Sequence, residues 1–268
     1  MTTTGKAVTR DVMQRDRPRA GNPAVERERF PPEWALGYYR RSPQVVRQMA
    51  YWTLRNAPGL RVSWGNMKRV RPFSDRYGWD RGLPVDRHYI EQWISRHAND
   101  IRGHVLEVKN AEYSSRFGTP GRITIIDRDK TNHHADLHVD LDVADSLPAA
   151  EFDCVILTQV LQYTSPGCCL ENLWRSLRPN GVLLISVPAL GRIDVDDGAD
   201  DKWRWTPPGL RAELARVGIE ATVEGFGNVL AGVSALLGLA VGDVSRKDLD
   251  VQDARFPVLT CGRAEKPR

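Results

Sequence analysis

The sequence predicts an α/β fold with a doubly wound, mostly parallel sheet, and two observations lead to this prediction. From about residue 83 onward, short apolar segments alternate with longer segments of helical periodicity, as in sheets whose strands are joined by crossover helices. The clearest strand covers residues 152–157, where the apolar run CVIL follows a turn marked by Pro148. An unbroken apolar run of this length is typical of a strand buried in a parallel sheet.

The other elements are justified by local signals. Helices are expected where apolar residues recur with helical spacing or where helix-stop residues follow, at 84–97, 167–177, 208–217 and 229–239. Strands are expected at the short apolar segments, at 104–108, 122–126, 136–141, 152–157, 181–188, 220–224 and 256–261. Pro179, Asn180 and Gly181 stop the second of these helices, and Gly218 stops the third.

The composition is that of an ordinary globular protein. The 268 residues are 41% hydrophobic and 27% charged, with 38 Lys and Arg against 34 Asp and Glu, a net charge of +4. Beyond an N-terminal excess the basic residues are spread along the chain, so no nucleic-acid partner is expected. No apolar run approaches the ~20 residues that cross a bilayer, and the polar start lacks the apolar core of a signal peptide. We therefore expect no membrane partner and a cytoplasmic location.

The four cysteines are Cys154, Cys168, Cys169 and Cys261. They show neither CxxC spacing nor the framework of a secreted protein. Cys154 and Cys261 lie in apolar runs, so both are expected to be buried and reduced. The adjacent Cys168 and Cys169 are expected to be inert.

Three segments are predicted along the chain. Residues 1–31 are polar, rich in Arg and interrupted by prolines, which predicts a disordered arm. Residues 32–75 predict a helical N-terminal extension, in which the helical pattern of 33–56 is broken near Pro43. Its aromatic residues suit packing on the core, covering an active site, or formation of a homodimer. Residues 76–268 are expected to form the main domain.

A longer pattern connects several of these elements. Residues 147–161 read LP…FDxVxxxxVL, and after a helix residues 177–188 read LRPNGVLLISVP. This pattern resembles the class I S-adenosylmethionine-dependent methyltransferases, over roughly residues 80–268. The resemblance implies a Rossmann-like sheet of seven strands whose last strand is antiparallel, S-adenosylmethionine as the cofactor, and methyl transfer to an O or N atom of a small-molecule acceptor.

A second segment narrows the resemblance. Residues 81–91 read RGLPVDRHYIE, which resembles bacterial methyltransferases associated with glycosyltransferases and secondary metabolism. That similarity implies a sugar-containing or secondary-metabolite acceptor.

The resemblance also implies a set of cofactor contacts at the ends of the first strands. Glu107 holds the acidic position at the end of the first strand, but the following loop, residues 109–113, has no glycine where the family favours it. Asn110 tolerates positive φ, which keeps a sharp turn feasible, and Lys109 adds a cation beside the cofactor. The cofactor-binding residues expected on this basis are Glu107, Asn110, Tyr113, Asp127, Asp140, Leu141 and Gln159.

Two of these assignments have neighbouring alternatives. Asp127 ends the second strand, where the family's carboxylate binds both ribose hydroxyls, a task suited to a group that accepts two hydrogen bonds. Asp129 is its register-shifted rival. Asp140 and Leu141 follow the third strand, where the family binds adenine, and Asp142 and Asp145 lie close by in sequence.

The acceptor is expected between three segments at the carboxyl edge of the sheet. Tryptophan and tyrosine rings offer flat apolar faces and Arg a partner for a carboxylate or phosphate, so the predicted acceptor-binding residues are Tyr89, Gln159, Tyr163, Trp203 and Arg204. The aspartates of residues 194–201 are expected to form a solvated lid, with one Trp anchoring the loop. His88, by its helical phase, is expected to face water.

No catalytic base is assigned from the sequence, and no metal site is expected. His133, His134 and His138 lack a third and fourth ligand in suitable geometry. Two other classes of function compete with the enzyme. A non-catalytic, methyltransferase-like binding or scaffold protein is suggested by the glycine-free loop. A nucleotide-sugar-binding Rossmann protein is disfavoured, because no GxGxxG occurs.

Overall fold

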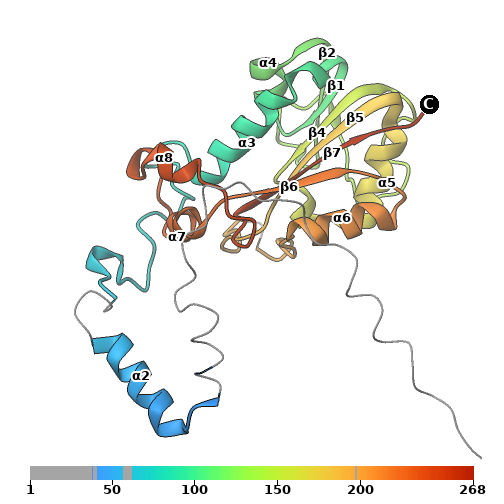
Figure 1. The fold of residues 1–268 in the computed structure, drawn as a ribbon. Helices are drawn as coiled ribbons and strands as arrows, with labels where there is room; N and C mark the ends of the chain where they lie inside the picture. The colour runs from blue at the N-terminus through green and yellow to red at the C-terminus, as the bar shows by residue number, and fades with distance from the viewer. Residues whose placement is uncertain (1–37, 39–40, 57–61, 197) are drawn as a thin grey trace, which may run out of the picture. The chain divides into compact units, whose positions relative to one another are not determined.

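The computed structural model describes residue 38 and residues 41–56, 62–196 and 198–268 (Figure 1). The chain divides into two units, Met1–Lys68 and Arg69–Arg268. In the first unit the structure describes helix α2 (Gln44–Asn56) and the 3₁₀ helix η2 (Gly65–Met67). Val45, Val46 and Met49 on α2 are exposed within it. The predicted arm, residues 1–31, and most of the predicted helical segment before Pro43 lie outside the described residues.

A seven-stranded sheet forms the centre of the second unit, in the order β3-β2-β1-β4-β5-β7-β6. Its strands are β1 (Arg102–Val108), β2 (Thr119–Asp127), β3 (Leu137–His138), β4 (Phe152–Thr158), β5 (Leu177–Pro188), β6 (Thr222–Phe226) and β7 (Leu259–Glu265). The first five strands pair in parallel, and β7 pairs antiparallel with both β5 and β6. The predicted Rossmann-like α/β fold with an antiparallel last strand is confirmed.

Helices flank this sheet. They are α3 (Val85–Arg96), α4 (Glu112–Phe117), α5 (Pro166–Ser176), α6 (Pro207–Arg216), α7 (Val229–Leu236) and α8 (Arg246–Leu249), with the 3₁₀ helices η3 (Ala98–Asp100), η4 (Leu161–Tyr163) and η5 (Val241–Asp243). The four predicted helices correspond to α3, α5, α6 and α7. Local chemistry fixes two of the starts, because the Thr206 hydroxyl accepts from the Gly209 N–H and the Asn228 side chain accepts from the Ala231 N–H.

Two apolar clusters cover opposite faces of the sheet. Neighbouring residues of one strand belong to different clusters, since Val155 packs with α5 and α6 whereas Cys154 and Ile156 pack with α3. This alternation follows from the two-residue period of a strand. It explains why β4 and β5 are apolar along their whole length, and it buries Cys154 and Cys261 as predicted.

Most strand bounds are shifted by two to four residues from the prediction, as in β7, which begins at 259 instead of 256. Two of the strands differ in a further way. β3 has only two residues instead of the six expected at 136–141. β5 begins at Leu177, four residues before the predicted start, and residues 178–181 bulge away from β4: Phe152 pairs with Leu177 and Cys154 pairs with Val182. Asn180 within this excursion has φ +62°. The Pro-Asn-Gly signal therefore marks a bulge inside the strand, where a residue without an N–H is tolerated.

Candidate functional site

The carboxyl ends of β1, β2, β4 and β5 meet at one edge of the sheet. β2 and β3 lie on one side of β1, and β4 and β5 lie on the other, so the strand order reverses between β1 and β4. Open α/β sheets bind ligands at this switch point, outside the carboxyl ends of the strands. The segments that follow these four strands carry most of the residues that the sequence singled out.

The loop after β1 bends without a glycine. Lys109 has φ +77°, the left-handed backbone conformation that glycine adopts at least cost. Its N–H donates to the Ile126 carbonyl at 2.8 Å, and its own carbonyl accepts from the Asn132 side-chain amide at 2.7 Å. Lys109 thus makes the bend for which the family uses glycine. The absence of glycine therefore does not prevent this loop from turning.

Glu107 organises the same loop from below. Its side chain is 1% exposed, and its two carboxylate oxygens accept from the backbone N–H groups of Tyr113 and Ser114 at 2.8 and 2.9 Å. Burial raises the pKa of Glu107, and these hydrogen bonds oppose the rise. Glu107 is therefore in place at the site, but its carboxylate is turned inward onto the start of α4 and has no surface for a ligand.

Asp127 is joined to the β1 loop through Asn132. One Asp127 carboxylate oxygen accepts from the Asn132 amide at 2.8 Å, and the other accepts from the Asp129 N–H at 3.0 Å. The same Asn132 amide holds the Lys109 carbonyl. The Asp129 side chain, by contrast, turns back to the N–H and hydroxyl of Thr131. Asp127 is thus the acid held beside the bend, and its half-buried carboxylate keeps accepting capacity for a ligand hydroxyl.

The remaining cofactor candidates divide into exposed and buried groups. Asp140 and Asn110 are exposed, and each side chain accepts from a backbone N–H two residues on, Asp142 and Glu112 respectively. Leu141 is buried and its carbonyl accepts from Asn172. Tyr113 is also buried, at 1% exposed, and its hydroxyl accepts from Arg87 at 2.7 Å.

Gln159 marks the end of β4 with a second strained backbone, at φ +55°. Its carbonyl accepts from the Gln162 amide at 2.9 Å, while its own amide nitrogen is buried without a hydrogen-bond partner among the described residues. Four further buried side-chain atoms nearby have no hydrogen-bond partner among the described residues: Gln162 Oε1, Ser186 Oγ, Arg192 Nε and Arg204 Nε. Buried polar atoms are almost always paired, so such a group of orphans at the sheet edge suits a site that a ligand or water completes.

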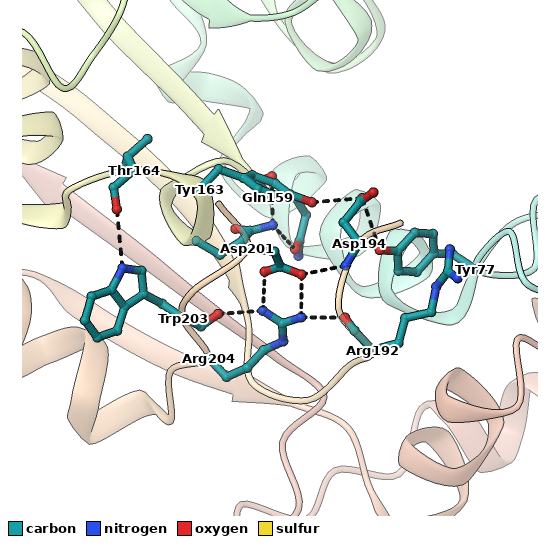
Figure 2. Close-up of polar contacts among 10 residues, drawn as sticks. Tyr77, Gln159, Tyr163, Thr164, Arg192, Asp194, Asp201, Trp203 and Arg204 are labelled. Atoms are coloured by element: carbon teal, nitrogen blue, oxygen red, sulfur yellow. Dashed lines mark hydrogen bonds and ion pairs between the residues drawn. The ribbon is translucent and has the colours of Figure 1, made fainter. Parts of the chain in front are cut away.

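Two tyrosines and one aspartate meet on the acceptor side of this edge (Figure 2). The hydroxyls of Tyr77 and Tyr163 both donate to Asp194 Oδ2, each at 3.1 Å. Burial first, and then the Asp194 charge, raises the pKa of Tyr77 to about 12 and raises that of Tyr163 as well. Both phenols are therefore neutral and keep their hydrogens at physiological pH. We call these residues the Tyr77–Asp194–Tyr163 cluster.

The segment that carries Tyr77 is fixed by close backbone contact with residues 237–240. The Phe73 N–H donates to the Leu237 carbonyl at 2.8 Å. Gly78 has φ +95°, and a Cβ there would lie 2.8 Å from the Leu239 carbonyl oxygen. A side chain at Gly78 would push the segment away, so this glycine sets the position of the Tyr77 ring.

Arg204 does not face an acceptor. Its two terminal nitrogens bind the Asp201 carboxylate side by side, with Nη2 at 2.8 Å from Oδ2, and also donate to the carbonyls of Arg192 and Trp203. Asp201 in turn accepts from the Asp194 N–H at 2.8 Å. Both terminal nitrogens of Arg204, which the sequence predicted to bind acceptor, are thus engaged by groups of the protein itself. Asp201 is buried and ion-paired, so the acids of 194–201 are not all solvated.

The aromatic residues considered for acceptor binding differ in how far they are exposed. Trp203 is 44% exposed, with its indole N–H donating to the Thr164 carbonyl at 3.3 Å, whereas Trp205 is buried and anchors the loop, as the sequence suggested for one of the two. Tyr89 is wholly buried, and its hydroxyl donates to the Leu249 carbonyl. In this structure Tyr89, predicted to bind acceptor, is therefore a core residue whose hydroxyl is occupied by a backbone carbonyl. His88 is mostly covered, beside Gln92 and Asp250, so it does not face water.

Tyr77, Arg192 and Asp194 were not predicted as site residues from the sequence. Arg192 places its guanidinium 4.0 Å from the Tyr77 ring centroid, a cation–π contact. One signal was present in the sequence: Tyr77 precedes a glycine between two aromatic residues, a sign of close backbone approach. No sequence signal distinguishes Asp194 from the acids around it.

One sequence family matches the middle of the chain. Residues 107–185, from the end of β1 into β5, match the sequence family described as a methyltransferase domain. S-adenosylmethionine is the cofactor that this match indicates. No protein of curated function matches the chain.

Several solved methyltransferase structures are similar to the chain. A methyltransferase from Haloferax volcanii, in complex with the Trm112 methyltransferase activator, is 17% identical, covers 75% of this chain and 100% of its own, and has a TM-score of 0.48. An S-adenosylmethionine-dependent methyltransferase from Mesorhizobium loti is 14% identical over 68% of this chain and 98% of its own, at 0.46. The 1,6-didemethyltoxoflavin-N1-methyltransferase of Burkholderia thailandensis is 17% identical over 68% and 81%, at 0.43.

Two kinds of site are not found among the described residues. Within the described ranges, no three His, Cys, Asp or Glu side chains are grouped so that they could hold a metal ion. In the same part of the chain, no helix is both long enough and apolar enough to cross a membrane.

Proposed function

We propose that this protein is an S-adenosylmethionine-dependent methyltransferase that acts on an O or N atom of a small-molecule acceptor. The observation that carries the proposal is the match of residues 107–185 to a methyltransferase domain. These residues include the whole edge between the end of β1 and β4, where the strand order reverses. The acceptor class that we favour is a sugar-containing or secondary metabolite, and its support is the sequence similarity of residues 81–91 alone.

The cofactor would lie against the β1 loop and the ends of β2 and β4. Asp127, held by Asn132, accepts hydrogen bonds from the ribose hydroxyls, a role in which a carboxylate can bind two donors at once. Asn110 and the bend at Lys109 bring backbone N–H groups to the ligand. Asp140 and Leu141 form the adenine end. The buried amide of Gln159, which has no partner among the described residues, donates to the cofactor or the acceptor.

Glu107 contributes indirectly, because its carboxylate fixes the start of α4 and so the shape of the loop. When bound, S-adenosylmethionine supplies a methyl group on a good leaving group, so the residues mainly have to position the acceptor and exclude water. Tyr163 and Trp203 would line the acceptor side. Tyr77 and Arg192 would also contact the acceptor there, in the roles that the sequence predicted for Tyr89 and Arg204.

Calorimetry with S-adenosylmethionine tests the cofactor assignment. Asp127→Ala should weaken binding by about 1.5–3 kcal/mol, the cost of losing hydrogen bonds to a charged group. Asp129→Ala is the matched control, since its side chain is committed to Thr131, and it should bind like the parent. Equal loss in both variants would contradict the ribose assignment, and no binding by the parent protein would overturn the proposed function. The homodimer through residues 32–75 remains a prediction.

A further inference from the structure

We propose that the Tyr77–Asp194–Tyr163 cluster is the docking point for a hydrogen-bond donor of the acceptor, an amine N–H or a sugar-type O–H. This inference rests on the proposed function, because it names the acceptor chemistry of that site. It begins from the convergence of three segments: Tyr77 precedes α3, Tyr163 ends η4 after β4, and Asp194 lies in the loop after β5. Figure 2 shows the two phenols reaching the same carboxylate from different sides.

The number of free hydrogen-bond donors in the cluster determines whether it can donate to a ligand or only accept from one. A phenol has one hydrogen to donate and lone pairs with which to accept, and a carboxylate can only accept. Both phenol hydrogens are committed to Asp194 Oδ2. The Tyr77 and Tyr163 oxygens can therefore offer a ligand only lone pairs. A ligand group that meets these oxygens must itself donate.

The cluster is held so that this polarity is difficult to reverse. The Asp194 N–H donates to Asp201, whose carboxylate is clamped by Arg204, and Asp194 Oδ1 accepts from the Asp196 N–H at 2.8 Å. The phenol hydrogens would have to leave an ionised acceptor to turn outward, which costs a charge-assisted hydrogen bond. Preorganised groups of this kind orient a ligand without paying for rearrangement on binding.

The nearby Arg192 suggests a different ligand for this site, an anion. Its guanidinium stacks on the Tyr77 ring, and its Nε atom is buried without a partner among the described residues. Arginine is suited to carboxylate and phosphate, so an anionic acceptor would bind there instead. The cluster itself favours a ligand that donates hydrogen bonds. Its three side chains all carry acceptor oxygens, and both phenol hydrogens are already donated to Asp194. An experiment with small probes can separate these two outcomes.

The test uses the full chain, saturated with S-adenosylhomocysteine and labelled with ¹³C at tyrosine Cζ. Tyr77→Phe and Tyr163→Phe assign the two signals. Methylammonium presents N–H donors, glycerol presents O–H donors, tetramethylammonium has the same charge as methylammonium but no donor, and acetate is the anionic probe. We expect methylammonium or glycerol to shift both signals saturably, and tetramethylammonium and acetate to leave them in place. The more effective donor distinguishes an amine acceptor from a hydroxyl acceptor.

Substitutions localise the response. Asp194→Asn should weaken the response to the effective donor at least tenfold, because the amide can donate to the phenol oxygens and occupy their lone pairs. Asp196→Asn is the matched control. It removes the same charge two residues away, where the side chain is exposed and only the backbone N–H meets Asp194, and it should respond like the parent. If Asp194→Asn does not fold, Tyr163→Phe should weaken the Tyr77 response instead.

Three outcomes overturn the inference: neither donor moves the signals, acetate moves them, or Asp194→Asn responds like the parent. S-adenosylhomocysteine affinity, measured on the same samples, keeps the two proposals apart. A parent protein that binds S-adenosylhomocysteine with silent tyrosines refutes the docking point alone. A parent protein that does not bind S-adenosylhomocysteine refutes the proposed function.

Discussion

The side-chain amide of Asn132 donates to the carbonyl of Lys109 at 2.7 Å, across 23 positions of sequence. Lys109 is the residue of the β1 loop with positive φ, at +77°. Because the same amide also reaches Asp127, one asparagine joins the bend to the proposed ribose ligand. The bend is thus stabilised from outside the loop, which allows a residue with a side chain where glycine would be intrinsically favoured.

The backbone of Lys109 gives a first prediction. Lys109→Gly removes the steric cost of positive φ and should leave the free energy of unfolding unchanged or slightly higher. Lys109→Val adds a branched Cβ in the same conformation and should lower the free energy of unfolding by about 1–2 kcal/mol relative to the glycine variant. Urea denaturation measures both. Equal stability of the two variants would show that the loop does not hold this conformation in solution.

The second prediction concerns the titration of Tyr77, whose pKa is raised to about 12 by burial and by Asp194. Spectrophotometric titration should show a tyrosine that ionises near that pH and is absent in Tyr77→Phe. Since the folded state keeps a proton that the unfolded chain loses near pH 10, the contribution of this group to stability is present below pH 10 and is lost as pH rises toward 12. Asp194→Asn should move the ionisation to lower pH. An unmoved Tyr77 in that variant would argue against the contact.

The third prediction concerns Asp201 and Arg204. Asp201 is buried while Arg204 is partly covered, so Asp201→Ala or Arg204→Ala alone leaves a charge without its partner and should lower the free energy of unfolding by about 1–3 kcal/mol. The double variant should lose less than the sum of the two. A double-mutant cycle by urea denaturation measures this coupling.

The exposed pair of Arg216 and Glu213 is the control for that cycle. Its Arg side chain is 64% exposed, and such pairs are worth about 0–1 kcal/mol. Additive effects at Asp201 and Arg204, like those expected for the control, would mean that the clamp does not act as a unit.

The fourth prediction concerns the end of α5. The Lys266 ammonium donates to the carbonyls of Trp174 and Leu177, each at 2.7 Å, so it satisfies carbonyls that the helix end leaves unpaired. Lys266→Met keeps the apolar stem and should lower the free energy of unfolding by about 1–2 kcal/mol. Lys247→Met, at an exposed position, should have little effect. Thermal or urea unfolding that fails to separate the two variants would rule out this cap.

The sequence predicted the elements whose signals are local. Residues 152–157 were recognised as a strand because an apolar run carries its own periodicity, and α6 because prolines begin it and Gly218 follows it. The bulge at 178–181 could not be predicted, because Pro179 and Gly181 give the same signal for a helix stop and for a strand irregularity. Only the pairing of Phe152 with Leu177 distinguishes the two.

The candidate site was predicted less completely, for a related reason. Tyr77 and Asp194 are 117 positions apart, and no sequence pattern in either segment predicts that the two residues are in contact. The pairing of Arg204 with Asp201 could not be predicted, because an arginine suits an external anion as well as it suits Asp201, and the sequence does not show which carboxylate is near. The partner of Tyr89 could not be predicted either, because a tyrosine on the buried face of a helix gives no sign whether its hydroxyl meets a ligand or a carbonyl such as that of Leu249.

The position of β7 in the sheet has a consequence for the order of folding. β7 is inserted between β5 and β6, and β6 pairs with no other strand of the sheet. During synthesis the five parallel strands can associate as they emerge, but β6 has no partner until residues 259–265 have left the ribosome. Until then both β5 and β6 present open edges, the features most prone to mispairing between chains. Completion of this sheet therefore waits for β7, the last of its strands in sequence order, which closes both edges at once.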